Sequence, residues 1–170
     1  MDEFTLDLSG EGFSEEDLKQ GDGEYKLMPK GWYTAALFEP LELRETPDGS
    51  IRIEGSFSEF ENDKGETYLE GIGGIGGRKV RWGVWAKYDG EPKPEAVRKA
   101  LTSLAVAFGV ADVDASGKSL PPAADMLESL EILNGMLGSR CQVQVGHRSS
   151  GKRDDGTPFR NETIRQVKAI

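Results

Sequence analysis

Cysteine and histidine are nearly absent from this chain, which has one of each, Cys141 and His147. A single cysteine excludes a disulfide framework within one chain, and the two residues together are too few for a Cys/His zinc site. Cys141 alternates with valines, and this pattern predicts buried packing rather than a nucleophile. Long apolar runs are also missing, because none approaches the roughly 18 residues that a membrane-spanning helix needs. We therefore expect a reduced protein of the cytoplasm.

A convincing catalytic constellation is missing as well. The acidic pairs Asp112/Asp114 and Asp154-Asp155 lie in expected loops, whereas a two-metal nuclease needs several inward carboxylates on rigid elements. Gly117-Lys118-Ser119 looks like the end of a phosphate-binding loop, but Asp112 stands where that motif requires glycine. The glycine-rich run Gly71–Gly77 is not followed by the helix of a dinucleotide-binding loop. We expect no enzymatic activity, no cofactor and no metal site.

An excess of positive charge is missing: 30 acidic residues against 21 basic ones give a net charge of −9, which by itself argues against a nucleic-acid partner. The acid is concentrated at one end: residues 1–24 contain nine acidic residues and one lysine, which leaves −1 for residues 25–170. A near-neutral body leaves room for local basic patches. We therefore divide the chain into an acidic, partly ordered arm over 1–26 and a domain over 27–170. The arm serves solubility, or else it mimics a nucleic-acid strand or recruits a partner. Its alternating Phe4, Leu6 and Leu8 are compatible with a short docked strand.

Glycine, by contrast, is abundant, with 22 residues, which is typical of a loop-rich β protein. Alternating apolar residues predict strands, and apolar residues repeating every three to four positions predict helices. The expected order is strands at Trp32–Arg44, Ile51–Phe60 and 78–88, helices at Glu95–Phe108 and Ala123–Leu137, and strands at Arg140–Arg148 and Phe159–Lys168. Pro47-Asp48-Gly49 predicts a turn between the first two strands, and broken alternation predicts a bulge or an edge position for the last. This order is that of the OB-fold, so we predict a mainly β, five-stranded OB-fold-like Greek-key barrel with helices between strands three and four.

The segment 78–88 is the most informative stretch of the chain, because alternation divides it into two faces. Val80, Trp82, Val84 and Ala86 fall on one side and are expected in the core. Lys79, Arg81, Trp85 and Lys87 fall on the other side, where cations stand beside an indole ring. A one-residue bulge at Gly83 would exchange the two faces.

Cations attract phosphates and aromatic rings stack on unpaired bases, so both residue types at the binding positions of the expected barrel suggest a nucleic-acid partner. An OB-fold binds oligonucleotides on one strand face and through the loops after its first and fourth strands. The simpler interpretation of each basic group alone is a solvated surface, and it is their common placement that favours binding. The candidate residues are Lys79, Arg81, Trp85 and Lys87 on the third strand, Arg52 and Phe60 on the second, and Arg148, Lys152, Arg153, Phe159 and Arg160 around the last loop.

Three short motifs resemble a phage-encoded family that has long been uncharacterised. The first is Leu27-Met28-Pro29-Lys30-Gly31-Trp32-Tyr33-Thr34-Ala35, which looks like the leucine-x-proline-x-glycine-x-tyrosine signature at the start of that family's barrel. The second runs from Ala100-Leu101 to Ala107-Phe108-Gly109-Val110, and the third is Leu137-Gly138-Ser139-Arg140-Cys141-Gln142-Val143. The resemblance covers about residues 27–169, and the motifs are mostly structural.

The resemblance implies an OB-like fold and a role among phage replication and recombination proteins, as a binder of single-stranded DNA in the host cytoplasm. It supplies no binding residues. We therefore expect binding of single-stranded DNA with little sequence preference. The residues leave open whether the protein also binds RNA and whether it forms oligomers. The alternative is an adaptor that recruits a replication or recombination enzyme through its acidic arm or a sheet edge. Bacterial single-strand binders usually recruit partners through an acidic C-terminal tail, whereas this sequence ends Gln166-Val167-Lys168-Ala169-Ile170.

Overall fold

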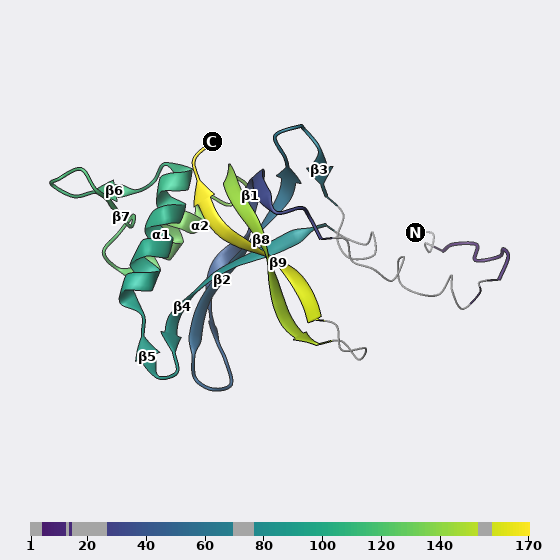
Figure 1. Ribbon diagram of the computed structural model, residues 1–170, viewed down its shortest axis with the longest axis horizontal. Helices are drawn as coiled ribbons and strands as arrows, with labels where there is room; N and C mark the ends of the chain where they lie inside the picture. The colour runs from purple at the N-terminus through teal and green to yellow at the C-terminus, as the bar shows by residue number, and fades with distance from the viewer. Residues whose placement is uncertain (1–4, 13, 15–26, 70–76, 153–157) are drawn as a thin grey trace.

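The computed structural model describes residues 5–12, 14, 27–69, 77–152 and 158–170, and the side chains of residues 150–152 and 158–160 lie outside that description. The fold is mainly β, and its antiparallel strands form a strongly curled sheet like half a barrel (Figure 1). Most of the acidic arm, residues 71–76 of the glycine-rich run and Asp154-Asp155 lie outside the described residues. The strands of the large sheet are β1 (Gly31–Glu45), β2 (Ile51–Glu61), β3 (Thr67–Tyr68), β4 (Lys79–Tyr88), β5 (Glu91–Pro92), β8 (Arg140–Lys152) and β9 (Pro158–Lys168).

The large sheet has the strand order β5-β4-β2-β1-β8-β9, and β3 pairs with β2. All the paired strands are antiparallel. The predicted turn joins β1 to β2: Gly49 adopts a φ of 84°, and the Asp48 carboxylate accepts hydrogen bonds from Thr46 and from the Ser50 amide. Short polar side chains of this kind hold turns closed by bonding the neighbouring backbone.

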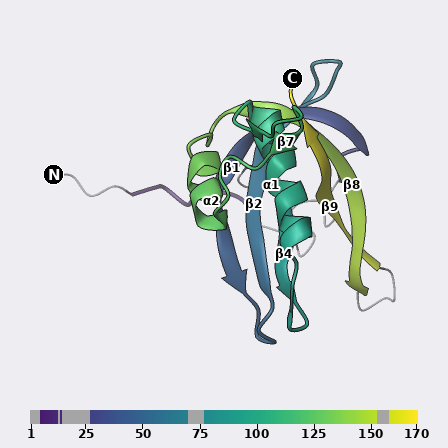
Figure 2. The same cartoon turned by 90° about the vertical axis from the view of Figure 1, so that its left-hand side faces the viewer.

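Two helices, α1 (Pro94–Phe108) and α2 (Met126–Asn134), separate β4 from β8 in the chain and lie on the same side of the sheet (Figure 2). Proline occupies the first turn of α1, where no backbone donor is needed, and Gly109 ends the helix in the left-handed conformation. Asp125 caps α2 by accepting from the Glu128 amide. Between the helices, β6 (Asp112–Val113) and β7 (Ser119–Leu120) form a separate two-stranded sheet.

The inner face of the curled sheet and the apolar stripe of α1 form one core. Trp82 is 7% exposed and lies opposite Gly55 of β2, and Val80 is buried opposite Phe57. The register of β2 with β4 has no shift at Gly83, so the predicted inward direction of Trp82 is confirmed. Phe57 stacks against Phe108 at a centroid distance of 6.5 Å, which joins the sheet to the end of α1.

Phe60 is not a surface residue, and its prediction as a base-stacking residue is wrong. Its side chain is fully buried, and its ring meets the edge of Tyr33 at a centroid distance of 6.1 Å. The cause is a bulge: Glu59 has a φ of 57°, and the pairing with β1 advances three residues on β2, from Ser58 to Glu61, against two on β1. A bulge inserts one residue and reverses the alternation beyond it, so Phe60 points inward like Phe57.

Strands β4 and β9 meet where the sheet curls round, and within the described residues no backbone ladder joins them. A buried ion pair connects them instead: the Arg78 guanidinium, just before β4, lies 2.9 Å from the Glu162 carboxylate of β9. Glu162 also accepts from the Met28 amide at 2.7 Å. Burial raises the pKa of Glu162, and the Met28 donor opposes this shift. The pair therefore ties the two edges of the half-barrel to the residues that lead into β1.

Candidate nucleic-acid interface

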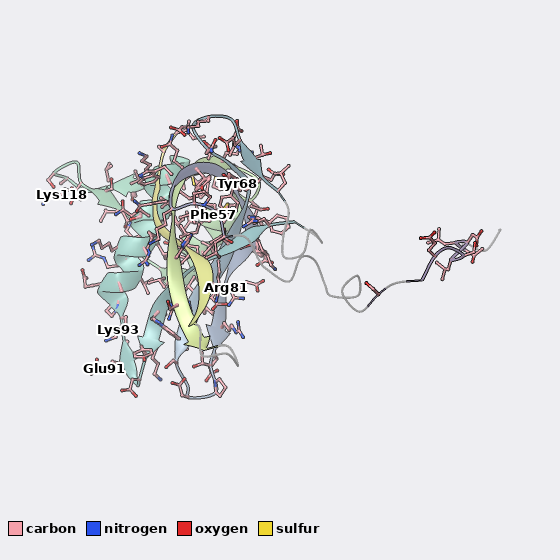
Figure 3. The ribbon with its side chains drawn as sticks, turned by 45° about the vertical axis from the view of Figure 1, so that its right-hand side comes forward. Phe57, Tyr68, Arg81, Glu91, Lys93 and Lys118 are labelled. Atoms are coloured by element: carbon pink, nitrogen blue, oxygen red, sulfur yellow. The ribbon has the colours of Figure 1, made fainter. Side chains whose placement is uncertain are left out.

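A hollow of about 410 Å³ lies between the β8–β9 hairpin and strands β1, β2 and β4, in the region of Arg81 in Figure 3. It is lined mainly by charged and polar side chains, and Val80 of the core also contributes to it. Five strands contribute to it. The lining residues are Glu39, Arg52, Ser56, Lys79, Val80, Arg81, Arg148, Asn161, Glu162 and Thr163.

Arg52 of β2 lies flat across its neighbour strand because that strand has a glycine at the crossing point. A Cβ added to Gly83 would lie 2.5 Å from the Arg52 Nε atom, so any larger residue would displace the guanidinium. The Arg52 Cζ atom lies 5.1 Å from the centroid of the Trp85 ring, which is a cation–π distance. Burial lowers the pKa of Arg52, Glu54 opposes the shift, and the positive charges of Arg148 and Arg81 lower it further.

Glu54 is the carboxylate at the centre of the arginines. Its oxygens lie 3.4 Å from Arg44, 3.5 Å from Arg52 and 3.9 Å from Arg81, and 18% of its side chain is exposed. The exposed Glu42 of β1 lies opposite Glu54 in the register of β1 with β2. The group thus contains two carboxylates and the four guanidinium groups of Arg44, Arg52, Arg81 and Arg148, so its net charge is positive. Glu54 holds the guanidinium groups of Arg44, Arg52 and Arg81 close together, where bare cations would repel one another.

Lys79 is already engaged, because its ammonium lies 2.6 Å from the Glu39 carboxylate, whose pKa this contact lowers. More than half of the Lys79 side chain is nevertheless exposed. Exposed pairs of this type contribute about 0–1 kcal/mol, so a phosphate could exchange with the carboxylate at little cost. The structure therefore places Lys79 at the rim of the hollow as a weaker candidate than the arginines.

Trp85 shares the outward face of Arg52, its cross-strand neighbour. The ring is partly exposed and lies 5.1 Å from the ring of Tyr88, at an interplanar angle of 54°. Half of Tyr88 is exposed. An indole between a guanidinium and a phenol ring, with open surface beside it, is suited to stacking on a base.

Lys87 departs from the prediction that it shares a face with Arg81 and Trp85. The register shifts so that Lys87 lies opposite Ile51, whereas Trp85 lies opposite the adjacent Arg52. Ala86 is therefore an extra residue between them, and it reverses the alternation of β4 at this point. Lys87 does not line the hollow.

The structure thus brings together Arg52, Arg81, Arg148 and Trp85, with Lys79 at the rim. It separates from them Phe60, which is buried, and Lys87, which follows the bulge. Arg153 lies outside the described residues, and so do the side chains of Lys152, Phe159 and Arg160. Sequence reasoning missed Glu54, whose importance depends on three arginines from different parts of the sheet. The one available signal for this group of side chains is Gly83, because a glycine inside a strand indicates close approach by another group, here the Arg52 guanidinium.

Other chemistry finds little support in the described part of the chain. Cys141 is buried, and burial raises the pKa of its thiol to about 12, which keeps the nucleophilic thiolate from forming. In the ranges that the structure describes, no three His, Cys, Asp or Glu side chains lie close enough to hold a metal ion. Neither described helix has the length and apolar character needed to cross a membrane.

No protein-family model matches the chain, and a search of curated proteins finds no significant match.

Proposed function

We propose that this protein binds single-stranded DNA with little sequence preference, without catalysing a reaction on it. The observation that carries the proposal is the convergence of Arg52, Arg81 and Arg148, from three strands, on one hollow beside the partly exposed ring of Trp85. Guanidinium groups bind phosphate oxygens, and the indole stacks on any base, because every base has a π face. Sequence preference would require fixed hydrogen-bond donors and acceptors directed at base edges, whereas arginine and indole contact features that all nucleotides share.

We also infer that the curled sheet is an OB-fold-like barrel. The strand order supports this: β4, β2, β1, β8 and β9 are the long strands, and the two helices separate the third long strand from the fourth. In such a fold the hollow described above would correspond to the usual oligonucleotide-binding face. The resemblance of the three motifs supports the further proposal that the chain belongs to a phage replication and recombination group.

Titration of a fluorescent oligothymidine, followed by anisotropy, tests the proposed function. Three arginine–phosphate contacts predict a slope of about −2 in log affinity against log salt, since each contact on a single strand contributes about −0.7. Affinity should then fall about 20-fold between roughly 50 mM and roughly 200 mM salt. Absence of binding at low salt would refute the proposal.

Single variants test whether the hollow is the site. Arg81→Gln and Arg148→Gln should each weaken binding and reduce the salt slope by about 0.7. Arg98→Gln is the matched control, because Arg98 is an exposed arginine of α1 that pairs with Glu95. If Arg98→Gln weakens binding as much as the other two variants, the interaction depends on net charge and not on this hollow.

A second candidate function is an adaptor for a replication or recombination enzyme. The observation that favours an adaptor is the exposure of Leu6 and Leu8, which are 66% and 89% exposed. Residues 5–12 form no strand, so the docked strand with which the alternation is compatible is not found there. Exposed apolar side chains beside Asp7 could pack against a partner. Capture of a single replication or recombination enzyme that persists after nuclease treatment, and that is lost in a Leu6→Ser/Leu8→Ser variant, would favour the adaptor.

A further inference from the structure

The outer face of β8 and β9 carries a second group of cations and an aromatic ring. The Lys168 Nζ atom lies 4.0 Å from the centroid of the Trp32 ring, a close cation–π contact. Arg165 is exposed and donates to the His147 carbonyl at 3.0 Å. Within the described residues neither Arg165 nor Lys168 lies within 4.0 Å of a carboxylate oxygen, so both charges remain available.

Arg165 lies on this face over a glycine of the neighbouring strand, as Arg52 does. A Cβ added to Gly146 of β8 would lie 2.5 Å from the Arg165 Nε atom and 2.8 Å from its Cγ atom. The side chain therefore crosses the sheet over a glycine, as Arg52 does over Gly83. Arg165 falls at a register shift, since Val145 pairs with Ile164 and Gln144 with Gln166. The extra residue of this bulge directs Arg165 outward.

The register places these residues in one continuous path. Residues that lie opposite one another on neighbouring strands form a row, and the side chains of a row share one face of the sheet. Along β8 the successive rows are Arg148 with Asn161, Gly146 with Thr163, Gln144 with Gln166 and Trp32, and Gln142 with Lys168 and Thr34. None of these positions is Asp or Glu. The first two rows contribute Arg148, Asn161 and Thr163 to the hollow described above, so the path begins inside it.

The spacing suits an extended polymer. Residues two apart on one face of a strand are separated by roughly 7 Å, and neighbouring strands by roughly 5 Å. The backbone positions of Gly146 and Trp32 are therefore roughly 8 Å apart, and Arg148 is roughly 7 Å from Gly146 in the other direction. Cations at such intervals, with amide side chains between them and one indole, match the repeating phosphates and bases of a single strand.

We propose that the outer face of β8 and β9, with Arg165, Lys168 and Trp32 as its main contacts, binds the part of a longer single-stranded DNA that extends beyond the arginine hollow. The inference rests on the proposed function and adds a direction and a length to it. Phosphates would contact Arg165 and Lys168, a base would stack on Trp32 in exchange for the Lys168 contact, and the glutamines would donate to sugar and phosphate oxygens. A short strand would occupy only the hollow.

The test compares two oligothymidines, of about 6 and about 16 nucleotides, which span the usual site sizes of such domains. For the Arg165→Gln/Lys168→Gln variant we expect the affinity for the long strand to fall about tenfold and its salt slope to decrease by about 1.4, with the short strand unaffected. Trp32→Phe should weaken binding of the long strand only, and thermal unfolding checks that each variant is folded. Arg98→Gln/Lys99→Gln is the matched control, because it removes the same number of positive charges from the exposed surface of α1.

Each outcome has one meaning. Equal losses for both strands would overturn the inference, because Arg165 and Lys168 would then act in the hollow itself. Unchanged binding of both strands by folded variants would also overturn it. If the unmodified protein binds neither strand, the proposed function fails first; if it binds both strands with the same affinity, only the extension fails.

Discussion

Replacing Trp82 and Trp85 with alanine, one at a time, separates the core from the proposed binding face. The two indoles are three positions apart on β4 and point to opposite sides of the sheet. Trp82 is 7% exposed within the core, whereas Trp85 is partly exposed and contacts Arg52 and Tyr88. The same substitution should therefore reduce the free energy of unfolding at one position and the affinity for single-stranded DNA at the other.

The magnitudes follow from the surroundings of each ring. Removing a buried tryptophan costs about 3–5 kcal/mol, so Trp82→Ala should lower the Tm by roughly 6–20 °C for a domain of this size. Trp85→Ala loses one aromatic contact and one cation–π contact, which together contribute about 1–2 kcal/mol to stability. A base stacked on an indole contributes about 1–3 kcal/mol to binding, so Trp85→Ala should weaken DNA binding by about 5- to 150-fold.

The assays are thermal unfolding followed by circular dichroism and oligothymidine titration at a temperature where both variants are folded. Trp82→Phe serves as the conservative core control and should recover most of the stability. A Trp85→Ala variant that loses more stability than Trp82→Ala, or that binds DNA as the unmodified protein does, would refute the assignment of the two faces.

Three further predictions concern individual contacts. Gly83→Ala should displace the Arg52 guanidinium from β4 and weaken DNA binding several-fold. Gly77→Ala, with open space around it and no left-handed backbone, serves as the control for a glycine replacement and should leave binding unchanged. The Cys141 thiol, with its pKa raised to about 12, should resist a maleimide at about pH 8 in the folded protein and react in urea. Because the unfolded thiol ionises at about pH 8.5, the free energy of unfolding should fall by up to about 1.4 kcal/mol per pH unit between about pH 8.5 and the raised pKa. A Cys141→Ala variant that keeps this slope would contradict the assignment. Glu162→Ala should cost about 3–5 kcal/mol, since it leaves the buried Arg78 charge without this carboxylate, and Glu162→Gln should cost less; urea denaturation measures both, and equal costs would argue against a charge effect.

The main elements of the fold were predictable because each has a local pattern that repeats. The helix expected at Glu95–Phe108 is observed at Pro94–Phe108, and the strand expected at 78–88 is observed at Lys79–Tyr88. The two indoles of β4 point as alternation predicted. The expectation of a bulge or edge position for the last strand is confirmed too, since β9 has both.

Alternation failed where a bulge interrupts it. Phe60 and Lys87 each lie one residue beyond such a bulge, and each points away from the face that the period-2 pattern predicts for it. A bulge is a property of a pair of strands, because it exists only where one strand has an extra residue relative to its partner. The sequence of one strand does not contain the register of the other, so these two directions required the tertiary structure.

The amino-acid sequence by itself determined the composition of the candidate site: an arginine-rich, aromatic face on a near-neutral body, with the excess acid in the first 24 residues. The tertiary structure alone decided which of these residues meet. It gathered Arg52, Arg81 and Arg148 around one hollow, placed Glu54 among Arg44, Arg52 and Arg81, and aligned Arg165 and Trp32 on the outer face of β8 and β9. The physical reason is that side-chain period is set locally by backbone geometry, whereas proximity between strands depends on how far the sheet curls and where its register shifts.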